Sequence, residues 1–254
     1  MARAFQTRLA PPYLKQVRLR DDVAIDRARY PFNLPLFRDD DFQLRFDRAI
    51  TIIVGENGVG KSTLLEGIAA IAGFDQAGGG PGYRPLDHSE ALEHNGDRLQ
   101  DVLRASWLPK VGQGWFFRAE SFFSVARYLD RAALDAGALP PDFLSYSHGE
   151  GFLRFFEERC ARPGIFLFDE PESALSPRRQ FAFVKLLRTI AAAGKAQVIL
   201  ATHSPILMAT PGAALFSMTR AGIDPIGLHD TDHYRLYREF ILDPAGTVDA
   251  MSHD

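Results

Sequence analysis

Residues 55–63 most restrict how this chain of 254 residues can fold. They match the pattern G-x-x-x-x-G-K-[ST] at every defined position. The glycines let backbone N–H groups surround a phosphate chain, while the lysine adds a positive charge and the serine a hydroxyl suited to Mg²⁺. An apolar, β-branched run at 49–54 and helical spacing of apolar residues after the loop predict a strand–loop–helix unit. The loop consists of Gly55, Glu56, Asn57, Gly58, Val59, Gly60, Lys61, Ser62 and Thr63.

Two later segments predict further buried strands. Residues 165–168 are four apolar residues in a row, followed by Asp169 and Glu170. A helix predicted from Pro177 to Gly194 leads into residues 197–202, a second strand covered on both faces, after which comes His203. Strands that alternate with helices indicate a mostly parallel sheet, whose carboxyl ends hold ligands. We therefore expect Lys61, Asp169 and His203 to meet at one edge.

The remaining chain predicts two additions to this α/β core. Residues 14–25 and 42–46 alternate polar and apolar positions, as expected for an N-terminal antiparallel β element. Residues 77–82 are rich in glycine and predict a mobile surface loop. Helical patterns at 91–104 and 124–136 indicate a small helical lobe, placed at about 75–160 within one domain of residues 1–254.

Composition favours an ordinary globular protein. Hydrophobic residues make up 46% of the chain and the net charge is −3, which gives no support to nucleic-acid binding. We find no signal-peptide pattern and no apolar run of about 20 residues, the length needed to span a membrane. The sequence therefore predicts a soluble, cytoplasmic protein without membrane insertion.

The polar residues at the predicted strand ends suit phosphate and metal chemistry. Ser62 and Asp169 offer the hard oxygen ligands that Mg²⁺ prefers. Glu170 is placed to orient or deprotonate a water for in-line attack on a γ-phosphate, and His203 to donate a hydrogen bond to that phosphate. The structural alternatives are a pair of solvated carboxylates and a packing histidine. The accompanying phosphate loop favours the functional interpretation.

Taken in order, these motifs resemble those of the ABC-type ATPases. The further matches are Ser147, Gly149 and Glu150, which fit the S-x-G-[QE] signature, and residues 173–176, which resemble the D-loop. The resemblance implies a P-loop NTPase fold with a signature lobe, ATP and Mg²⁺ as ligands, and hydrolysis of ATP to ADP and phosphate. It also implies a head-to-tail dimer, because the signature of one subunit contacts the nucleotide held by the other.

Two details of the sequence refine this resemblance. A signature ending in Glu150 resembles the heads of SMC and DNA-repair ATPases, yet only 85 positions separate Ser62 from Ser147, too few for their long coiled coil. The family's glutamine after the strand near residues 115–117 is missing, and Arg118 or Glu120 are candidates to replace it. We leave that role unassigned.

Three functions are compatible with these features. The first is an ATP-driven switch whose homodimer controls an unidentified protein or nucleic-acid partner. The second is the ATP-binding subunit of a membrane transporter, and the third is a slow or non-hydrolytic nucleotide sensor.

Two segments outside the motifs carry weaker predictions. Tyr30 and Phe32 lie in a proline-punctuated loop and are candidates to stack on a nucleotide base, although packing is the more common role. Asp230, Asp232 and His233 offer metal-ligand chemistry, but a helix start capped by Asp232 is the preferred interpretation.

Overall fold

A computed structural model describes residues 9–253 except 39, 77, 82–94, 119–129, 132, 136, 138 and 140–147. Its larger sheet contains, in spatial order, β5 (Gly114–Arg118), β6 (Gly164–Asp169), β7 (Ala196–Ala201), β3 (Ile50–Val54), β8 (Ala214–Thr219) and β9 (Gly222–Pro225). The pairings from β5 to β8 are all parallel, and β9 pairs with β8 in the antiparallel direction. This arrangement confirms the mostly parallel α/β core predicted from the sequence.

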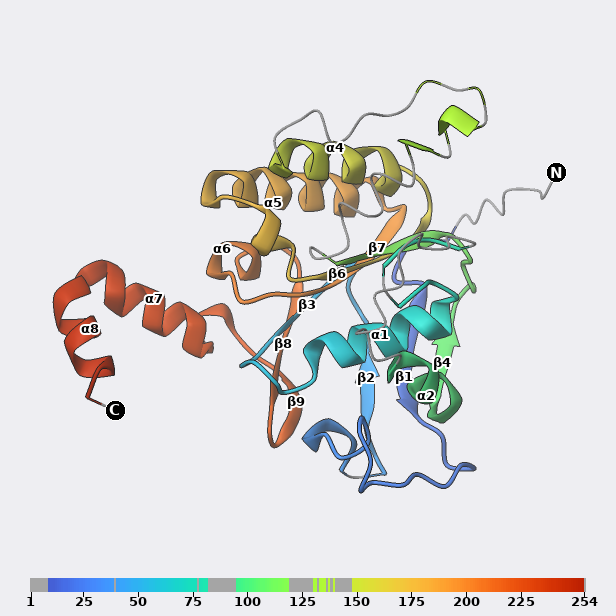
Figure 1. The fold of residues 1–254 in the computed structure, drawn as a ribbon, viewed down its shortest axis with the longest axis horizontal. Helices are drawn as coiled ribbons and strands as arrows, with labels where there is room; N and C mark the ends of the chain where they lie inside the picture. Colours follow the sequence, from blue (N-terminus) through green and yellow to red (C-terminus); the bar gives the residue numbers. More distant parts are fainter. Residues whose placement is uncertain are drawn as a thin grey trace.

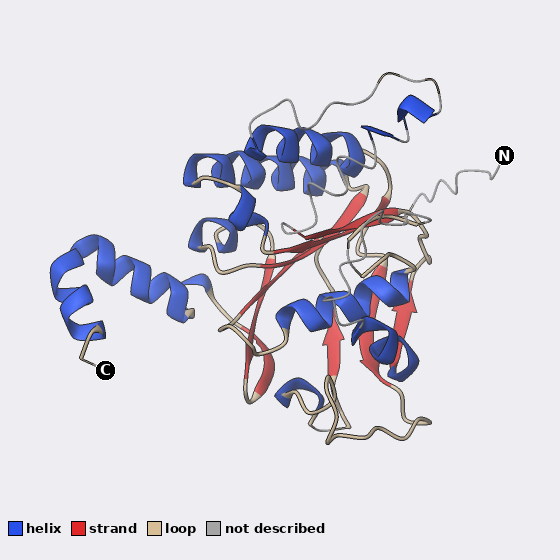
Figure 2. Cartoon of the chain, in the orientation of Figure 1, coloured by secondary structure: helices blue, strands red, loops and turns tan. Residues whose placement is uncertain are grey.

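Helices cover both faces of this sheet, so that every residue of its central strands β6, β7 and β3 is buried and most of them are apolar (Figure 2). Side chains such as Ile53 and Leu167 form one core with α1 (Lys61–Ala72). Alternate side chains such as Ile52 and Phe168 form a second core with α4 (His148–Cys160) and α5 (Pro177–Ala193). Helix α1 therefore lies on the opposite face from α4 and α5 (Figure 1).

A separate antiparallel sheet has the order β2 (Gln43–Arg45), β1 (Leu14–Leu19) and β4 (Leu103–Trp107). This confirms the predicted N-terminal β element, although β1 ends at Leu19 and not near residue 25. Strand β4 was not predicted, because residues 91–104 were interpreted as one helix. The structure instead ends α2 (Asn95–Val102) at Val102 and continues directly into the strand.

The glycine-rich segment also differs from the prediction of a mobile surface loop. Gly78, Gly79 and Gly80 are buried, and Gly79 exchanges backbone hydrogen bonds of 2.8 and 2.9 Å with Phe116 of β5. A Cβ atom on Gly80 would lie 2.6 Å from the Trp115 ring. Glycine is needed there for close approach to β5. The predicted helix at 124–136 lies largely outside the described residues.

Of the C-terminal helices, α7 (Asp232–Leu242) and α8 (Pro244–Met251) extend away from the sheet and end the described chain, whereas α6 (Pro205–Met208), which follows β7, packs beside α5 (Figure 1). Three short 3₁₀ helices lie in the connections: η1 (Pro35–Phe37), η2 (Pro171–Ala174) and η3 (Leu228–Asp230). Within the described residues, no helix combines the length and the apolar character required to cross a bilayer.

Gln197 of β7 joins the two sheets. Its side chain is fully buried, and its Oε1 accepts hydrogen bonds from the backbone N–H groups of Tyr13 and Leu14, both at 2.8 Å. Its Nε2 donates to the carbonyl oxygen of Leu14 at 3.0 Å. A single amide thus satisfies three backbone groups at the start of β1 and fixes that strand against the parallel sheet.

Replacing Gln197 with Ala should therefore destabilise the fold. We expect Gln197→Ala to lower the free energy of unfolding by about 3 kcal/mol, because buried N–H groups lose their acceptor. Urea denaturation followed by circular dichroism measures this change. Gln16→Ala is the matched control, since Gln16 makes an exposed side-chain bond to Gln43 and its loss should cost less than about 0.5 kcal/mol. Equal losses in the two variants would contradict the role given to Gln197.

Candidate functional site

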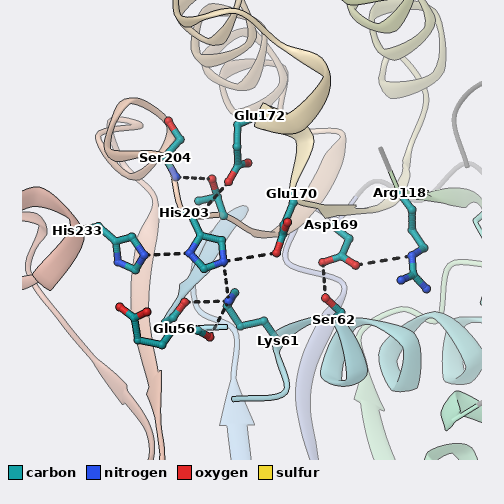
Figure 3. Close-up of polar contacts among 12 residues, drawn as sticks. Glu56, Lys61, Ser62, Arg118, Asp169, Glu170, Glu172, His203, Ser204 and His233 are labelled. Carbon is teal, nitrogen blue, oxygen red and sulfur yellow. Dashed lines mark hydrogen bonds and ion pairs between the residues drawn. The ribbon is translucent and has the colours of Figure 1, made fainter. Parts of the chain in front are cut away.

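The phosphate loop lies between β3 and α1 and surrounds the Lys61 side chain. Lys61 is only 4% exposed, and its Nζ donates to the carbonyl oxygens of Gly55 at 2.8 Å and Glu56 at 3.0 Å. A third contact, of 2.9 Å, joins Nζ to Nε2 of His203 (Figure 3). Burial lowers the pKa of Lys61, an effect opposed by the carboxylates of Glu170 and Asp169. Lys61 and His203 therefore meet, as the sequence predicts.

Glycine is required at two positions of this loop. A Cβ atom on Gly55 would lie 2.2 Å from the Met218 carbonyl oxygen of β8, closer than any real side chain can approach. Gly60 has a φ of +105° and lies against Leu34, where a Cβ atom would be 2.9 Å from Cδ1. The loop conformation and its close packing thus both depend on the absence of side chains.

Ser62 and Asp169 form the second part of the site. The Ser62 Oγ donates to Asp169 Oδ1 at 3.0 Å, which joins the first turn of α1 to the end of β6. Arg118, at the end of β5, lies with its Nε 3.7 Å from Asp169 Oδ2, and its Nη1 donates to Glu66 of α1 at 2.7 Å. All three charged side chains are no more than 14% exposed. Arg118 thus occupies the neighbourhood in which the sequence lacked a glutamine, whereas Glu120 lies outside the described residues.

Glu170 has an unusual backbone conformation. Its φ of +47° and ψ of +54° make it the one residue other than glycine with a positive φ in the described part of the chain. Such strain persists only where surrounding contacts hold it, and it is concentrated at functional sites. Here it turns the chain from β6 into η2 and leaves the carboxylate 40% exposed, with Oε1 3.4 Å from His203 Nε2.

Two residues around His203 were not predicted from the sequence. Glu172 is largely buried, which raises the pKa of its carboxyl group, and its Oε1 accepts a 2.6 Å hydrogen bond from the His203 backbone N–H. His233 places its Nε2 2.9 Å from His203 Nδ1 (Figure 3). The sequence does offer one sign of the role of Glu172, because it is a second carboxylate only two residues after Glu170. No local pattern pairs a strand end with a helix that starts about 30 residues later.

The two aromatic candidates for base stacking, Tyr30 and Phe32, lie in different environments. Phe32 is 9% exposed and belongs to the core with α1. Tyr30 is 38% exposed, and its hydroxyl lies 2.7 Å from Oγ1 of Thr63. It lines a cavity of about 220 Å³ together with Lys61, Ser62 and Glu170. Only Tyr30 is therefore placed to contact a ligand at the loop.

The signature residues lie partly beyond what the structure describes. Ser147 is outside the described residues, whereas Gly149 and Glu150 belong to the first turn of α4. Helix α4 packs on the face of the sheet opposite to α1, which carries Lys61 and Ser62. The structure thus brings together Lys61, Ser62, Asp169, Glu170 and His203 at one edge of the sheet, and it packs α4 on the face opposite to α1.

Residues 230–233 lead into a helix, which agrees with the interpretation of this segment as a helix start. Its cap is Thr231 and not Asp232: the Thr231 Oγ1 accepts from the backbone N–H of Tyr234 at 3.2 Å, and Asp232 is the first helical residue. Within the described residues, no group of three or more His, Cys, Asp or Glu side chains could hold a metal ion. Ser62 and Asp169 are a different type of donor set, completed in P-loop proteins by phosphate oxygens.

Two family models match separate parts of this chain. One, described as "AAA domain", matches residues 33–101, which include the phosphate loop. The other, described as "AAA domain, putative AbiEii toxin, Type IV TA system", matches residues 138–209, which include Asp169, Glu170 and His203.

Similar proteins of known family extend this result. The cytochrome c biogenesis ATP-binding export protein CcmA of Rhodopseudomonas palustris is 31% identical over 67% of this chain and 85% of its own length. The thiamine import ATP-binding protein ThiQ of Photobacterium profundum is 30% identical over 61% of this chain and 68% of its own. A solved structure described as "a putative metal-chelate type ABC transporter", in an inward-facing conformation, shares the fold with a TM-score of 0.50 at 16% identity, covering 89% of this chain and 88% of that one. The chain therefore belongs to the ABC-type P-loop ATPase family.

Proposed function

We propose that this protein binds Mg·ATP between two head-to-tail subunits and hydrolyses it, and that the resulting change of the dimer controls a partner molecule. The observation that carries this proposal is the meeting of Lys61, Ser62, Asp169, Glu170 and His203 at the carboxyl ends of β3, β6 and β7 (Figure 3). A cation, hard oxygen ligands, a carboxylate base and an imidazole are the groups that phosphoryl transfer to water requires.

The described residues fit both ligands. The glycines leave backbone N–H groups of the loop free of side-chain cover, so that the β- and γ-phosphates can approach them and Lys61. The Ser62 hydroxyl and the Asp169 carboxylate, 3.0 Å apart, are the oxygen ligands that would hold Mg²⁺. Bound there, Mg²⁺ would neutralise charge on the phosphate oxygens. Tyr30, beside the loop, is the aromatic that we assign to the nucleotide.

Glu170 is proposed as the base. Its carboxylate is partly exposed and can reach a water, while the strained backbone holds it at the end of β6. His203 lies beside it and beside Lys61, where its Nε2 can turn from Lys61 to the γ-phosphate. Hydrolysis removes the negative charge of the γ-phosphate, which Lys61 and His203 would contact. The loss of these contacts is how the nucleotide would alter a subunit interface.

The proposed dimer rests on the position of the signature residues. Gly149 and Glu150 lie in the first turn of α4, which packs on the sheet face opposite to α1, the helix that carries Lys61 and Ser62. A second subunit turned head to tail would bring its Ser147, Gly149 and Glu150 to the first subunit's nucleotide. The whole of residues 1–254 is proposed as one ATPase domain, whose region 75–160 holds this signature element together with β4 and β5.

Two versions of this function differ in the molecule that the ATPase acts on. The similarity to CcmA and ThiQ favours an ATP-binding subunit that acts with a membrane transporter. The glutamate that ends the signature, Glu150, and the arginine in place of the coupling glutamine favour a cytoplasmic switch acting on a protein or nucleic acid. Copurification of a multi-span membrane protein would support the transporter version and contradict the switch.

Glu170→Gln should separate nucleotide binding from hydrolysis. We expect this variant to bind Mg·ATP, to lose at least about 100-fold in turnover because the base is removed, and to accumulate as a dimer. Phosphate release and size-exclusion chromatography with light scattering measure these properties. Glu157→Gln, an exposed change on α4, is the matched control and should behave as wild type. Turnover near the wild-type rate in Glu170→Gln would contradict the assignment of the base.

Arg118 should stabilise the carboxylates at the base of the site. Arg118→Gln removes the cation next to Glu66 and Asp169, and we expect the free energy of unfolding to fall by about 3 kcal/mol. The double variant Glu66→Gln/Arg118→Gln removes one charge of each sign and should recover most of that loss. Arg154→Gln breaks an exposed pair with Glu158 and should cost less than about 1 kcal/mol. A double variant as unstable as Arg118→Gln would show that charge balance is not the cause.

A further inference from the structure

His233 lies beside the proposed site although it comes from the C-terminal part of the chain. It is the second residue of α7, and its Nε2 is 2.9 Å from Nδ1 of His203. The two ring centroids are 5.1 Å apart, with an angle of 55° between the ring planes. His203 therefore has neighbours on both ring nitrogens: Lys61 at 2.9 Å and the Glu170 carboxylate at 3.4 Å on Nε2, and His233 at 2.9 Å on Nδ1.

The backbone on both sides holds this contact in place. Thr231, which is 2% exposed, donates its hydroxyl to the Leu228 carbonyl oxygen at 2.8 Å and caps α7 through the N–H of Tyr234. The His203 backbone N–H is fixed by the Glu172 carboxylate at 2.6 Å. Hydrogen bonds thus fix the backbone next to both rings, at His203 itself and at Thr231, two residues before His233.

The hydrogen-bond partners define the tautomers of both rings. A lysine ammonium group can only donate, and its 2.9 Å contact with His203 Nε2 is shorter than the 3.4 Å between Nε2 and the Glu170 carboxylate. We therefore assign Nε2 as the acceptor from Lys61, without a proton. His203 then bears its proton on Nδ1 and donates it to His233 Nε2, which leaves the proton of neutral His233 on Nδ1. Burial, followed by the charge of Lys61, lowers the pKa of His203, in agreement with a neutral ring.

A bound γ-phosphate needs the opposite arrangement at His203, because phosphate oxygens only accept. His203 must then carry a proton on Nε2. If Nδ1 kept its proton as well, the ring would become a second cation within hydrogen-bond distance of the Lys61 ammonium group, whose charge lowers the pKa of His203 more than the nearby Glu170 carboxylate raises it. A neutral ring avoids this cost when Nδ1 gives up its proton and becomes an acceptor.

We propose that His233 is a positioning residue that allows His203 to exchange tautomers, accepting from Nδ1–H in the free site and donating to Nδ1 when Nε2–H faces the γ-phosphate. This inference rests on the proposed function. The proton balance is neutral: one proton enters His203 Nε2 from water, one passes from His203 Nδ1 to His233 Nε2, and one leaves His233 Nδ1 to water. His233 also lines a cavity of about 370 Å³ beside Val54 of β3 and residues 55–57 of the loop, through which water can reach it.

Substitutions at position 233 test this role. Gln offers both an acceptor and a donor near the position of Nε2, whereas Leu offers neither. We expect His233→Leu to lower kcat for ATP about tenfold, the effect of one lost neutral hydrogen bond, with KM changed less than about twofold. His233→Gln keeps a hydrogen bond to His203 Nδ1 in both states, although the amide cannot pass on a proton, so the Nδ1 proton would leave directly to water. We expect this variant to remain within about threefold of wild type. His253→Leu, a change at an exposed histidine near the end of α8, is the control and should have no effect.

A second measurement reads the tautomers directly and does not depend on turnover. Two-dimensional ¹H–¹⁵N spectra of the imidazole rings, assigned with the His203→Ala and His233→Leu variants, distinguish protonated from unprotonated nitrogens. We expect the His203 proton on Nδ1 in the free protein and on Nε2 in Glu170→Gln saturated with Mg·ATP. The same tautomer in both states, or equal kcat losses in His233→Leu and His233→Gln, would overturn the proposal.

The experiments distinguish a failure of the proposed ATPase function from a failure of the role given to His233. Absence of ATP turnover in the wild-type protein would contradict the proposed function itself. Turnover that His203→Ala abolishes but His233→Leu leaves unchanged would contradict only the role of His233.

Discussion

The buried ammonium group of Lys61 is the interaction on which the arrangement of the site depends. A cation with only 4% exposure is costly unless its three donors are satisfied, and here two loop carbonyl oxygens and the His203 ring accept from it. These contacts require the glycine conformations of the loop, which turn Gly55 and Glu56 carbonyls inward. They also require that His203 be unprotonated at Nε2, which links the loop to β7 and, through His233, to α7.

Charge balance extends from this point across the edge of the sheet. Asp169, Glu66 and Arg118 form a buried group in which one cation lies next to two carboxylates. A glutamine at the position of Arg118 would offer an oxygen to a metal, whereas an arginine cannot, since it has donors only. Arg118 is therefore better suited to hold the Asp169 carboxylate than to join the Mg²⁺ ligands, and this distinguishes the chain from the family pattern that its other motifs follow.

The sequence predicts the central part of this structure well because the apolar runs that precede Gly55, Glu170 and His203 are typical of strands buried on both faces. It fails where tertiary contacts outweigh local pattern. Leu103 and Arg104 end a charged, helix-like pattern, yet they belong to β4, which pairs with β1. Gly78–Gly80 have the composition of a loop, yet Gly79 and Gly80 pack against β5. His233 was assigned to a helix start, correctly, but its contact with His203 joins segments that nothing in their local sequence relates.

The central claim is that one chain cannot complete the site, and mixing two inactive variants tests it most directly. Lys61→Ala disables the loop, and Gly149→Asp disables the signature that we place in the other subunit's site. In a head-to-tail dimer, a mixed pair has one doubly altered site and one intact site, so an equal mixture should recover up to about a quarter of wild-type ATP turnover. A mixture as inactive as each variant alone, although mixed dimers form, would contradict the composite site.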